Sequence, residues 1–220
     1  MKVLRSTGLE GARGAAGTAV IIDVFRAFTT AAFCIAAGAR EVVLVGDHEQ
    51  ALALKTADPR LFLTGEIGGR PIAGFDAGNS PSVIQHLDLS GRRVVQRTSA
   101  GTQGVVAAAG ARHIVLGSLV IAGATLRHVR AIDDHVTLVA MGGNEIVEAD
   151  EDLACAVYME RQLLGGEGSR PVIRLLGDES GWPDWFPRED AILASDLDRF
   201  DFALPVVRED GLLIARPVSA

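Results

Sequence analysis

The sequence predicts an α/β fold in which a parallel or mostly parallel sheet is covered by helices on both faces. Short apolar runs alternate with segments of helical periodicity along most of the chain, as is typical of βαβ units. The first run, residues 18–22, is continuously apolar and ends at Asp23, which indicates a strand buried on both sides. The 220 residues, of which 48% are hydrophobic and 22% charged, suffice for one large α/β domain.

The remaining elements can be predicted in chain order. Residues 5–17 are rich in Gly and Ala and are expected to form a flexible lead-in. Further strands are predicted over residues 41–45, 61–63, 93–97, 113–116 and 136–140. Helices are predicted over residues 29–37, 48–56, 102–109, 121–131 and 150–164, with Gly38 ending the first and Asp47 capping the second. A long polar loop over residues 64–81 interrupts the alternation.

The chain changes character after about residue 165. A short acidic helix is expected over residues 189–199, and Asp210-Gly211 predicts the turn of a hairpin over residues 206–214. We expect a single domain, 1–220, with an α/β core over 18–165 and a C-terminal hairpin extension over 166–220. Two tryptophans among prolines, Trp182 and Trp185, are interpreted as packing or interface residues, and together with an apolar tail they are compatible with a homodimer.

Charge and composition exclude several classes of function. The net charge is −7 and basic runs are absent from the sequence, so nucleic acid is not an expected partner. The sequence holds no apolar stretch of membrane-spanning length and no signal-peptide core at its start, so we expect a cytoplasmic protein without a membrane partner. Cys34 and Cys155 lie in apolar helical patterns and are expected to be buried thiols.

Polar residues follow most of the predicted strands. Asp23, Glu66, the turn of residues 98–102, Ser118 and the glycine pair 142–143 all occupy such positions. Ligands of open α/β sheets bind at the carboxyl ends of the strands. We therefore expect these groups to meet along one edge of the sheet and to form an active site there.

The turn of residues 98–102 combines hydroxyl groups with the start of a helix. The first amides of a helix have no internal partners and carry partial positive charge, so they bind anions. Thr98, Ser99 and Thr102 add hydroxyl donors, and Gly101 allows close approach of a ligand to the backbone. The turn is thus a candidate phosphate site, and the alternative is an ordinary helix cap.

The segment of residues 23–30 offers a carboxylate, a guanidinium group and two hydroxyl groups. Asp23 at a strand end can bind a hard cation such as Mg²⁺. Arg26 can make a bidentate contact with a phosphate or carboxylate, and Thr29 and Thr30 begin a helix. The alternative is an Asp–Arg ion pair with threonine caps.

The long loop has the length and composition of a functional loop. Glu66 and Asp76 can join Asp23 as metal ligands, while Asn79 and Ser80 can donate hydrogen bonds to a substrate oxyanion. The alternative is a surface loop whose glycines form turns, with Ser80 capping the helix that starts at Pro81.

An acidic stretch, residues 148–152, precedes a long helix. The helix dipole favours acidic residues there, and this accounts for most of the stretch. Glu151 and Asp152 lie nearest the helix start and are the two candidates for a metal ligand or a general base.

Several of these segments resemble the 2-phosphosulfolactate phosphatase (ComB) family. Residues 23–30, DVFRAFTT, are similar to its DVLRASTT motif, and Gly65-Glu66 with residues 74–81, GFDAGNSP, resemble its GER…GFDxGNSP segment. Residues 98–102 are similar to its TTNGT turn, residues 117–119 to its GSLxN turn, and residues 151–156 to its ED…AG helix start. The resemblance covers about residues 18–165.

This resemblance implies a three-layer α/β/α fold with a mostly parallel or mixed sheet, and a Mg²⁺-dependent phosphatase. The family removes phosphate from 2-phospho-3-sulfolactate on a route to coenzyme M. It implies that Asp23, Glu66 and Asp76 bind the metal and that the substrate is a small anionic phosphate ester. We expect catalytic roles for these three carboxylates and for Arg26, Glu151 and Asp152. The expected phosphate contacts are Arg26, Thr29, Thr30, Asn79, Ser80, Thr98, Ser99, Gly101, Thr102 and Ser118.

The sequence departs from the family motifs at three polar positions. Ile67 replaces an arginine, and Ala100 and Ile121 replace asparagines. Arg70 and Arg97 are the candidates to compensate. The departures indicate a different acid substrate or reduced catalytic power. They also leave open a non-catalytic binder of a small phosphorylated or carboxylated metabolite, and a lyase or transferase acting on a phosphorylated acid.

Overall fold

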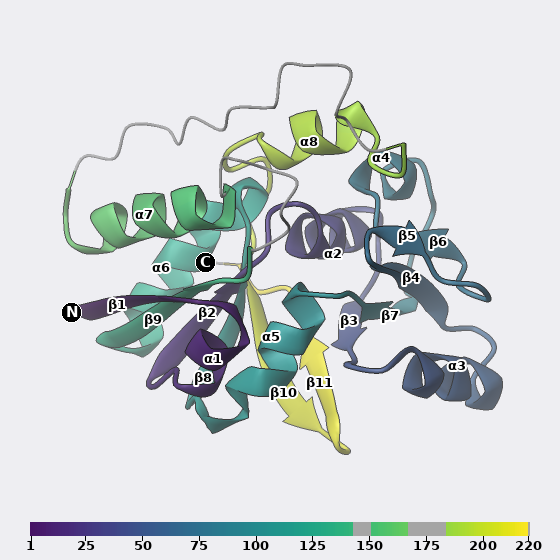
Figure 1. Cartoon of the computed structure of the whole chain (residues 1–220), viewed down its shortest axis with the longest axis horizontal. Helices are drawn as coiled ribbons and strands as arrows, with labels where there is room; N and C mark the ends of the chain where they lie inside the picture. The colour runs from purple at the N-terminus through teal and green to yellow at the C-terminus, as the bar shows by residue number, and fades with distance from the viewer. Residues whose placement is uncertain (143–150, 167–183, 220) are drawn as a thin grey trace.

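The computed structural model describes residues 1–142, 151–166 and 184–219, and eleven strands in these ranges form one large sheet (Figure 1). The strands are β1 (Lys2–Thr7), β2 (Thr18–Ile22), β3 (Glu41–Leu44), β4 (Phe62–Ile67), β5 (Arg70–Pro71), β6 (Ala77–Gly78), β7 (Arg93–Arg97), β8 (His113–Gly117), β9 (His135–Ala140), β10 (Leu204–Glu209) and β11 (Leu212–Ala215). The α-helices are α1 (Gly8–Arg13), α2 (Ala27–Ala36), α3 (His48–Ala57), α4 (Pro81–Ile84), α5 (Gly101–Ala107), α6 (Ala122–Ile132), α7 (Glu151–Leu163) and α8 (Arg188–Ala194).

The sheet consists of two parallel sets joined by an antiparallel hairpin. Its order is β1-β9-β2-β8-β10-β11-β3-β7-β4-β5, with β6 paired to β4. The first four strands are parallel to one another, as are β3, β7 and β4. The hairpin β10–β11 pairs antiparallel with β8 on one side and with β3 on the other. The sheet is therefore mixed, one of the two arrangements expected.

Alternate residues of the strands face different helices. Ile21 of β2 belongs to a buried cluster that includes residues of α1, α2 and α5, whereas Ile22 packs in a second cluster with α6 and α7. In β3, Val43 packs in a third cluster with α3. Figure 1 shows α1 and α5 together on one face of the sheet. The structure thus confirms the predicted three-layer α/β/α fold.

The strongly apolar strands and the long helices lie close to their predicted positions. All five residues of β2 are buried, as expected of a continuously apolar run. Asp47 caps α3 by accepting a hydrogen bond from the backbone N–H of Glu49 at 3.0 Å. Cys34 and Cys155 are buried free thiols, also as expected. In the ranges that the structure describes, no helix is both long and apolar enough to span a bilayer.

The predicted flexible lead-in is wrong, because residues 2–7 form β1 and residues 8–13 form α1. Strand β1 pairs in parallel with β9 at the edge of the sheet. Four of its six side chains are exposed, so the strand needs no apolar run and lacks the pattern that identifies buried strands.

The C-terminal hairpin is confirmed, but it is not an extension of a finished core. It occupies the centre of the sheet, between β8 and β3. Its turn has Asp210 and Gly211 at φ of 51° and 78°, the left-handed pair that an Asp-Gly turn favours. In Figure 1 this hairpin lies between the two halves of the molecule. Residues 204–215 therefore belong to the core.

Candidate functional site

A cavity of about 350 Å³ lies where the carboxyl ends of β2, β4 and β7 come together. Three antiparallel pairings separate β8 from β3, so the two parallel sets run in opposite senses along the sheet. Their carboxyl ends still meet, since Gly101 after β7 packs against Asp23 after β2. The described residues that line the cavity are Gly8, Leu9, Asp23, Phe25, Arg26, Glu66, Gly68, Gly69, Asn79, Ser99, Ala100, Met141, Gly142, Glu151, Asp152, Trp185 and Phe186.

Asp23 follows β2 and is 5% exposed. Its Oδ1 accepts a hydrogen bond from the backbone N–H of Ala27 at 2.9 Å. Burial raises the pKa of the Asp23 carboxyl to about 6, with a further rise from the charge of Glu66; the backbone N–H groups of Ala27 and Gly101 and the charge of Arg26 oppose the rise. A carboxyl group with this pKa changes protonation near neutral pH, as functional-site acids often do.

The turn before α5 packs its backbone directly against Asp23. A Cβ atom at Gly101 would lie 2.8 Å from Asp23 Oδ2 and 2.7 Å from the Cβ of Ala27. The Gly101 N–H donates a hydrogen bond to the Asp23 carboxylate. This amide therefore serves a carboxylate of the chain. Only glycine fits at position 101, because a Cβ atom there would clash with Ala27 and Asp23.

The two threonines of the same turn bond to each other, contrary to their predicted role in phosphate binding. The Thr102 backbone N–H donates to Thr98 Oγ1 at 3.0 Å, and the Thr98 N–H donates to Thr102 Oγ1 at 2.8 Å. Both side chains are buried, and neither lines the cavity. Their hydroxyl groups close the turn, which is the capping alternative, whereas Ser99 is exposed and lines the cavity.

Glu66 clamps the loop after β4 to the turn before α5. Its Oε1 accepts from the Ser99 N–H at 2.5 Å, and its Oε2 accepts from the Ser99 hydroxyl at 3.0 Å and from the Gly69 N–H at 2.6 Å. Glu66 is 7% exposed and lines the cavity as predicted. With both oxygens engaged, it holds two walls of the cavity together.

Arg26 is the arginine that lines this cavity in the part of the chain described, and its guanidinium is held from three sides. Its Nη1 donates to Asp190 Oδ2 at 2.7 Å and its Nη2 to the carbonyl of Gly69 at 3.2 Å. The guanidinium carbon lies 4.6 Å from the ring centre of Phe186 and 5.6 Å from that of Trp185. Such contacts fix the orientation of a fork that recognises phosphate or carboxylate.

Asp190 supports the site by pairing with Arg26, and it was not predicted from the sequence. It is fully buried on α8, and its Oδ1 accepts from the hydroxyls of Ser80 and Ser82 and from the Ser82 N–H. The hydroxyl of Ser80 therefore donates to Asp190, contrary to its predicted role in holding a substrate oxyanion. In sequence, Asp190 is one of several acids in a short helix, and nothing distinguishes it from a solvent-exposed residue.

Two aromatic residues beside α8 also belong to the cavity. Trp185 and Phe186 stack with ring centres 5.9 Å apart and line its wall. Trp185 is thus a packing residue, as interpreted, and in addition lines the cavity, while Trp182 lies outside the described residues. A Cβ atom at Gly69 would clash with the Trp185 ring, so the glycine lets the ring close against the loop.

The predicted acids at the start of α7 reach the cavity. Asp152 is 2% exposed, and its Oδ1 accepts from the Val24 N–H at 2.6 Å, which brings it next to Asp23. Glu151 is 8% exposed and lines the same cavity. The other acids of the stretch, Glu148 and Asp150, lie outside the described residues, as does Gly143.

Asn79 also lines the cavity and is oriented by Gln96. The Gln96 Nε2 donates to Asn79 Oδ1 at 3.3 Å and to the carbonyl of Ala27 at 2.7 Å. With its carbonyl oxygen engaged in this way, Asn79 has its amide N–H groups to offer a ligand. The contact of Asn79 with a substrate oxygen stays a prediction.

Asp76 does not reach the cavity, contrary to the prediction of a metal ligand. Its carboxylate accepts from Lys55 Nζ at 2.8 Å and from the Leu63 N–H at 2.7 Å. Leu63 lies near the beginning of β4, whereas Glu66 lies near its end, so the strand holds the two carboxylates apart. The ion pair with Lys55 gives Asp76 a structural role in the loop.

Three predicted hydroxyl residues are fully buried and are not among the residues that line the cavity. Thr29 Oγ1 lies 2.7 Å from Ser118 Oγ and donates to the carbonyl of Val24 at 2.8 Å. Thr30 is fully buried, and its hydroxyl has no hydrogen-bond partner in the described part of the chain. The expected phosphate contacts of these three residues are therefore corrected to packing roles.

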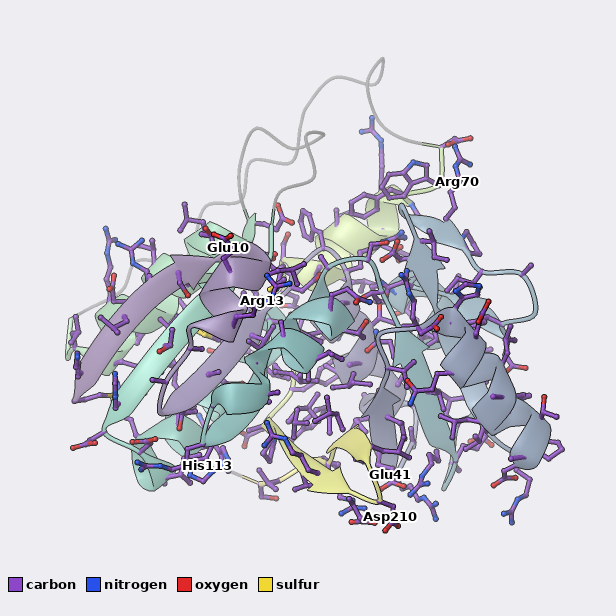
Figure 2. All side chains as sticks on the ribbon, turned by 60° about the horizontal axis from the view of Figure 1, so that its bottom comes forward. Glu10, Arg13, Glu41, Arg70, His113 and Asp210 are labelled. Carbon is purple, nitrogen blue, oxygen red and sulfur yellow. The ribbon has the colours of Figure 1, made fainter. Side chains whose placement is uncertain are left out.

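Among the described residues, no second arginine lines the cavity to compensate for the departures from the family motifs. Arg97 donates from Nη1 to the carbonyl of Glu66 at 2.9 Å, and Arg70 is largely exposed, 3.5 Å from Asp184. Figure 2 shows Arg70 at the outer margin of the molecule. Of the substituted positions, Ala100 lines the cavity, Ile67 is exposed and Ile121 is buried.

The cavity has the chemistry of a cation site, although the described residues do not supply a complete set of ligands. Asp23, Glu66, Glu151 and Asp152 face it, with Arg26 as its positive partner, and oxygen donors are the ligands of hard cations. Within residues 1–142, 151–166 and 184–219, however, no group of three or more His, Cys, Asp or Glu side chains is arranged to hold a metal ion.

Comparisons with known proteins identify relatives of this chain. The profile of the family described as 2-phosphosulpholactate phosphatase matches residues 6–175. A protein of Deinococcus radiodurans named probable 2-phosphosulfolactate phosphatase is 41% identical over 151 residues, 68% of this chain and 63% of that protein. Proteins with the same name are 34% identical in Bacillus subtilis over 64% of this chain and 61% of that protein, and 38% identical in Thermus thermophilus over 66% and 60%. The chain thus spans less than two thirds of the length of these relatives.

Proposed function

Because the chain belongs to the 2-phosphosulpholactate phosphatase family, we propose that it hydrolyses a small acidic phosphate monoester of the 2-phosphosulfolactate type. The observation that carries the proposal is the convergence of Asp23, Asp152 and an oriented Arg26 on one cavity. A volume of about 350 Å³ is suited to a small ligand.

We propose further that a divalent cation such as Mg²⁺ binds in this cavity. The carboxylates of Asp23 and Asp152 are its proposed ligands, because Asp152 is hydrogen-bonded to the residue that follows Asp23. Four carboxylates against one guanidinium would repel an anionic ester. When bound, Mg²⁺ polarises the phosphoryl group and lowers the pKa of a water molecule.

The residues of the chain have distinct proposed roles. Arg26, whose guanidinium is fixed by Asp190, binds a phosphate or carboxylate oxygen of the substrate. The amide of Asn79 donates to another oxygen, and Glu151 accepts the proton of the attacking water. Glu66 positions Ser99 and the loop, since both of its oxygens are engaged. Phosphoryl transfer depends mainly on such positioning and charge stabilisation.

The test is phosphate release from a panel of phosphomonoesters that includes 2-phospho-3-sulfolactate. We expect turnover with Mg²⁺, none in EDTA, and none with the Asp23→Asn variant. The matched control is Asp76→Asn, which changes a carboxylate outside the cavity. The absence of phosphate release across a broad panel would overturn the proposal.

The same panel tests the two alternatives. Thermal stabilisation by a phosphorylated acid without phosphate release would support a non-catalytic binder, since a ligand of the folded state stabilises by mass action. Substrate loss without free phosphate, followed by ³¹P NMR, would indicate a lyase or transferase. The cytoplasmic location, the homodimer and the route to coenzyme M stay predictions from the sequence and the resemblance.

A further inference from the structure

A second cavity, of about 490 Å³, lies at the other end of β7 from the candidate site. Strand β7 runs from Arg93 at this cavity to Arg97 beside Glu66, and these four residue steps span about 13 Å. Figure 2 labels Glu41, which pairs with Arg93, at the lower end of the molecule, far from Arg70. The described residues that line the cavity are Arg40, Asp58, Arg60, Leu61, Ser90, Gly91, Arg92 and Arg93.

The guanidinium of Arg92 is held in place without a carboxylate. Its Nη2 donates to the carbonyl of Arg60 at 3.0 Å and to that of Leu61 at 3.4 Å, and its Nε donates to the carbonyl of Arg60 at 3.2 Å. The ring of Phe62 lies 5.5 Å from its carbon. No acidic side chain pairs with Arg92 in the residues that the structure describes.

Two further arginines of the cavity share one buried carboxylate. Glu41 Oε1 lies 2.5 Å from Arg93 Nε and 3.3 Å from Arg40 Nε, while Oε2 accepts from Arg216. Arg216 also pairs with Glu209 at 2.8 Å. The carboxylate of Glu41, whose side chain is 6% exposed, thus fixes the Arg93 guanidinium at the wall of the cavity.

The charges at the cavity do not cancel. Arg60 pairs with Asp58, at 2.9 and 3.0 Å, and Arg216 balances Glu209. The four lining arginines are therefore opposed by three carboxylates, those of Asp58, Glu41 and Asp88, the last of which accepts from the N–H of the lining residue Ser90 at 3.0 Å. A surplus of one positive charge results, in a chain whose net charge is −7. Such a local concentration of positive charge attracts an anion of matching charge.

We propose that this arginine-lined cavity is a second anion site, which binds a phosphate group. The ligand is inorganic phosphate itself, or the terminal phosphate of pyrophosphate or of a nucleoside triphosphate. Guanidinium groups suit phosphate because they offer paired N–H donors. Arg92 and Arg93 are oriented before the ligand arrives, which reduces the entropic cost of binding. The site is independent of the candidate active site and of its proposed reaction.

Calorimetric titration in EDTA tests the proposal, because removal of divalent cations suppresses phosphate binding at the metal-dependent site. Inorganic phosphate, pyrophosphate and ATP are the probes. We expect saturable binding to the wild type and about a tenfold loss of affinity in Arg92→Gln and in Arg40→Gln, since each removes a charge-assisted contact. The side chain of Arg40 is 60% exposed, so its variant keeps the test valid if Arg92→Gln fails to fold.

A control variant separates this site from other anion binding. Arg112→Gln changes an arginine outside the cavity that is 71% exposed, and it should bind like the wild type. Tighter binding of ATP than of pyrophosphate would identify a nucleotide as ligand, and equal binding an inorganic phosphate. The proposal is overturned if the wild type shows no saturable binding up to about 10 mM, or if Arg40→Gln and Arg92→Gln bind as it does.

Discussion

The Oδ2 atom of Asp190 lies 2.7 Å from the Nη1 atom of Arg26, and the two side chains are 0% and 5% exposed. The partners are 164 positions apart, and Asp190 lies beyond the segment that the family profile matches. The C-terminal part of the chain thus orients the arginine of a cavity built mainly from the N-terminal part.

Replacement of Asp190 by Asn should impair both folding and function. Loss of one partner of a buried ion pair leaves an uncompensated charge and costs about 3–5 kcal/mol of unfolding free energy. A misplaced Arg26 should lower kcat/KM by about a hundredfold. Denaturant unfolding and steady-state kinetics measure the two effects.

Ser82→Ala is the matched control, because it removes a donor to Asp190 Oδ1 but leaves the Arg26 pair intact. We expect it to cost about 1 kcal/mol and to leave kcat/KM near the wild-type value. Equal kinetic losses in the two variants would contradict an orienting role of Asp190.

Glu66→Gln should change the pH dependence of the reaction. The charge of Glu66 raises the pKa of Asp23, so its removal should shift the acid limb of the kcat/KM profile to lower pH. Weaker fixation of Ser99 and Gly69 should raise KM. Asp76→Asn, a neutralised carboxylate of the same loop, should shift neither quantity, and an unshifted acid limb in Glu66→Gln would refute the coupling.

In EDTA, the wild type should lose stability as the pH rises from about 4 to 6. The folded-state pKa of Asp23, about 6, lies above the reference value of 3.8. The folded state therefore binds more protons in this interval, and the free energy of unfolding falls by up to about 3 kcal/mol. Urea unfolding at several pH values should show this fall in the wild type. Asp23→Asn should lack that component, and parallel curves for the two proteins would disprove it.

Gly101→Ala should disrupt the site, because the added Cβ would lie 2.7 Å from that of Ala27 and 2.8 Å from Asp23 Oδ2. Overpacking of this kind costs about 1–3 kcal/mol, and displacement of Asp23 should abolish most of the activity. Gly110→Ala is the control, since a Cβ there meets nothing within 4 Å. Thermal unfolding and phosphate release would show whether the two variants differ as expected.

The sequence identified those parts of the fold that have a local signal. Continuously apolar runs marked β2 and β3, and the residues after β2 and β4 marked Asp23 and Glu66 as cavity residues. Strand β1 had no such signal, because an exposed edge strand tolerates polar side chains. Asp76 was misplaced because spacing along a loop does not determine which end of β4 the loop crosses.

The roles of paired side chains could not be predicted either. Whether Thr98 and Thr102 face a ligand or each other depends on turn geometry, and both outcomes use the same residues. Asp190 requires knowledge of a contact with Arg26 from a distant segment. Sequence patterns report burial and local conformation, whereas these contacts are fixed by tertiary packing.

The hairpin between β8 and β3 bears on how the protein is made. Every strand that it joins precedes it in the chain, so on the ribosome both flanking units emerge before the piece that unites them. Until residues 204–215 leave the exit tunnel, β8 and β3 each present an unpaired edge, the kind of surface that promotes aggregation of nascent chains. Shortening the chain before residue 204 would leave that exposure permanent.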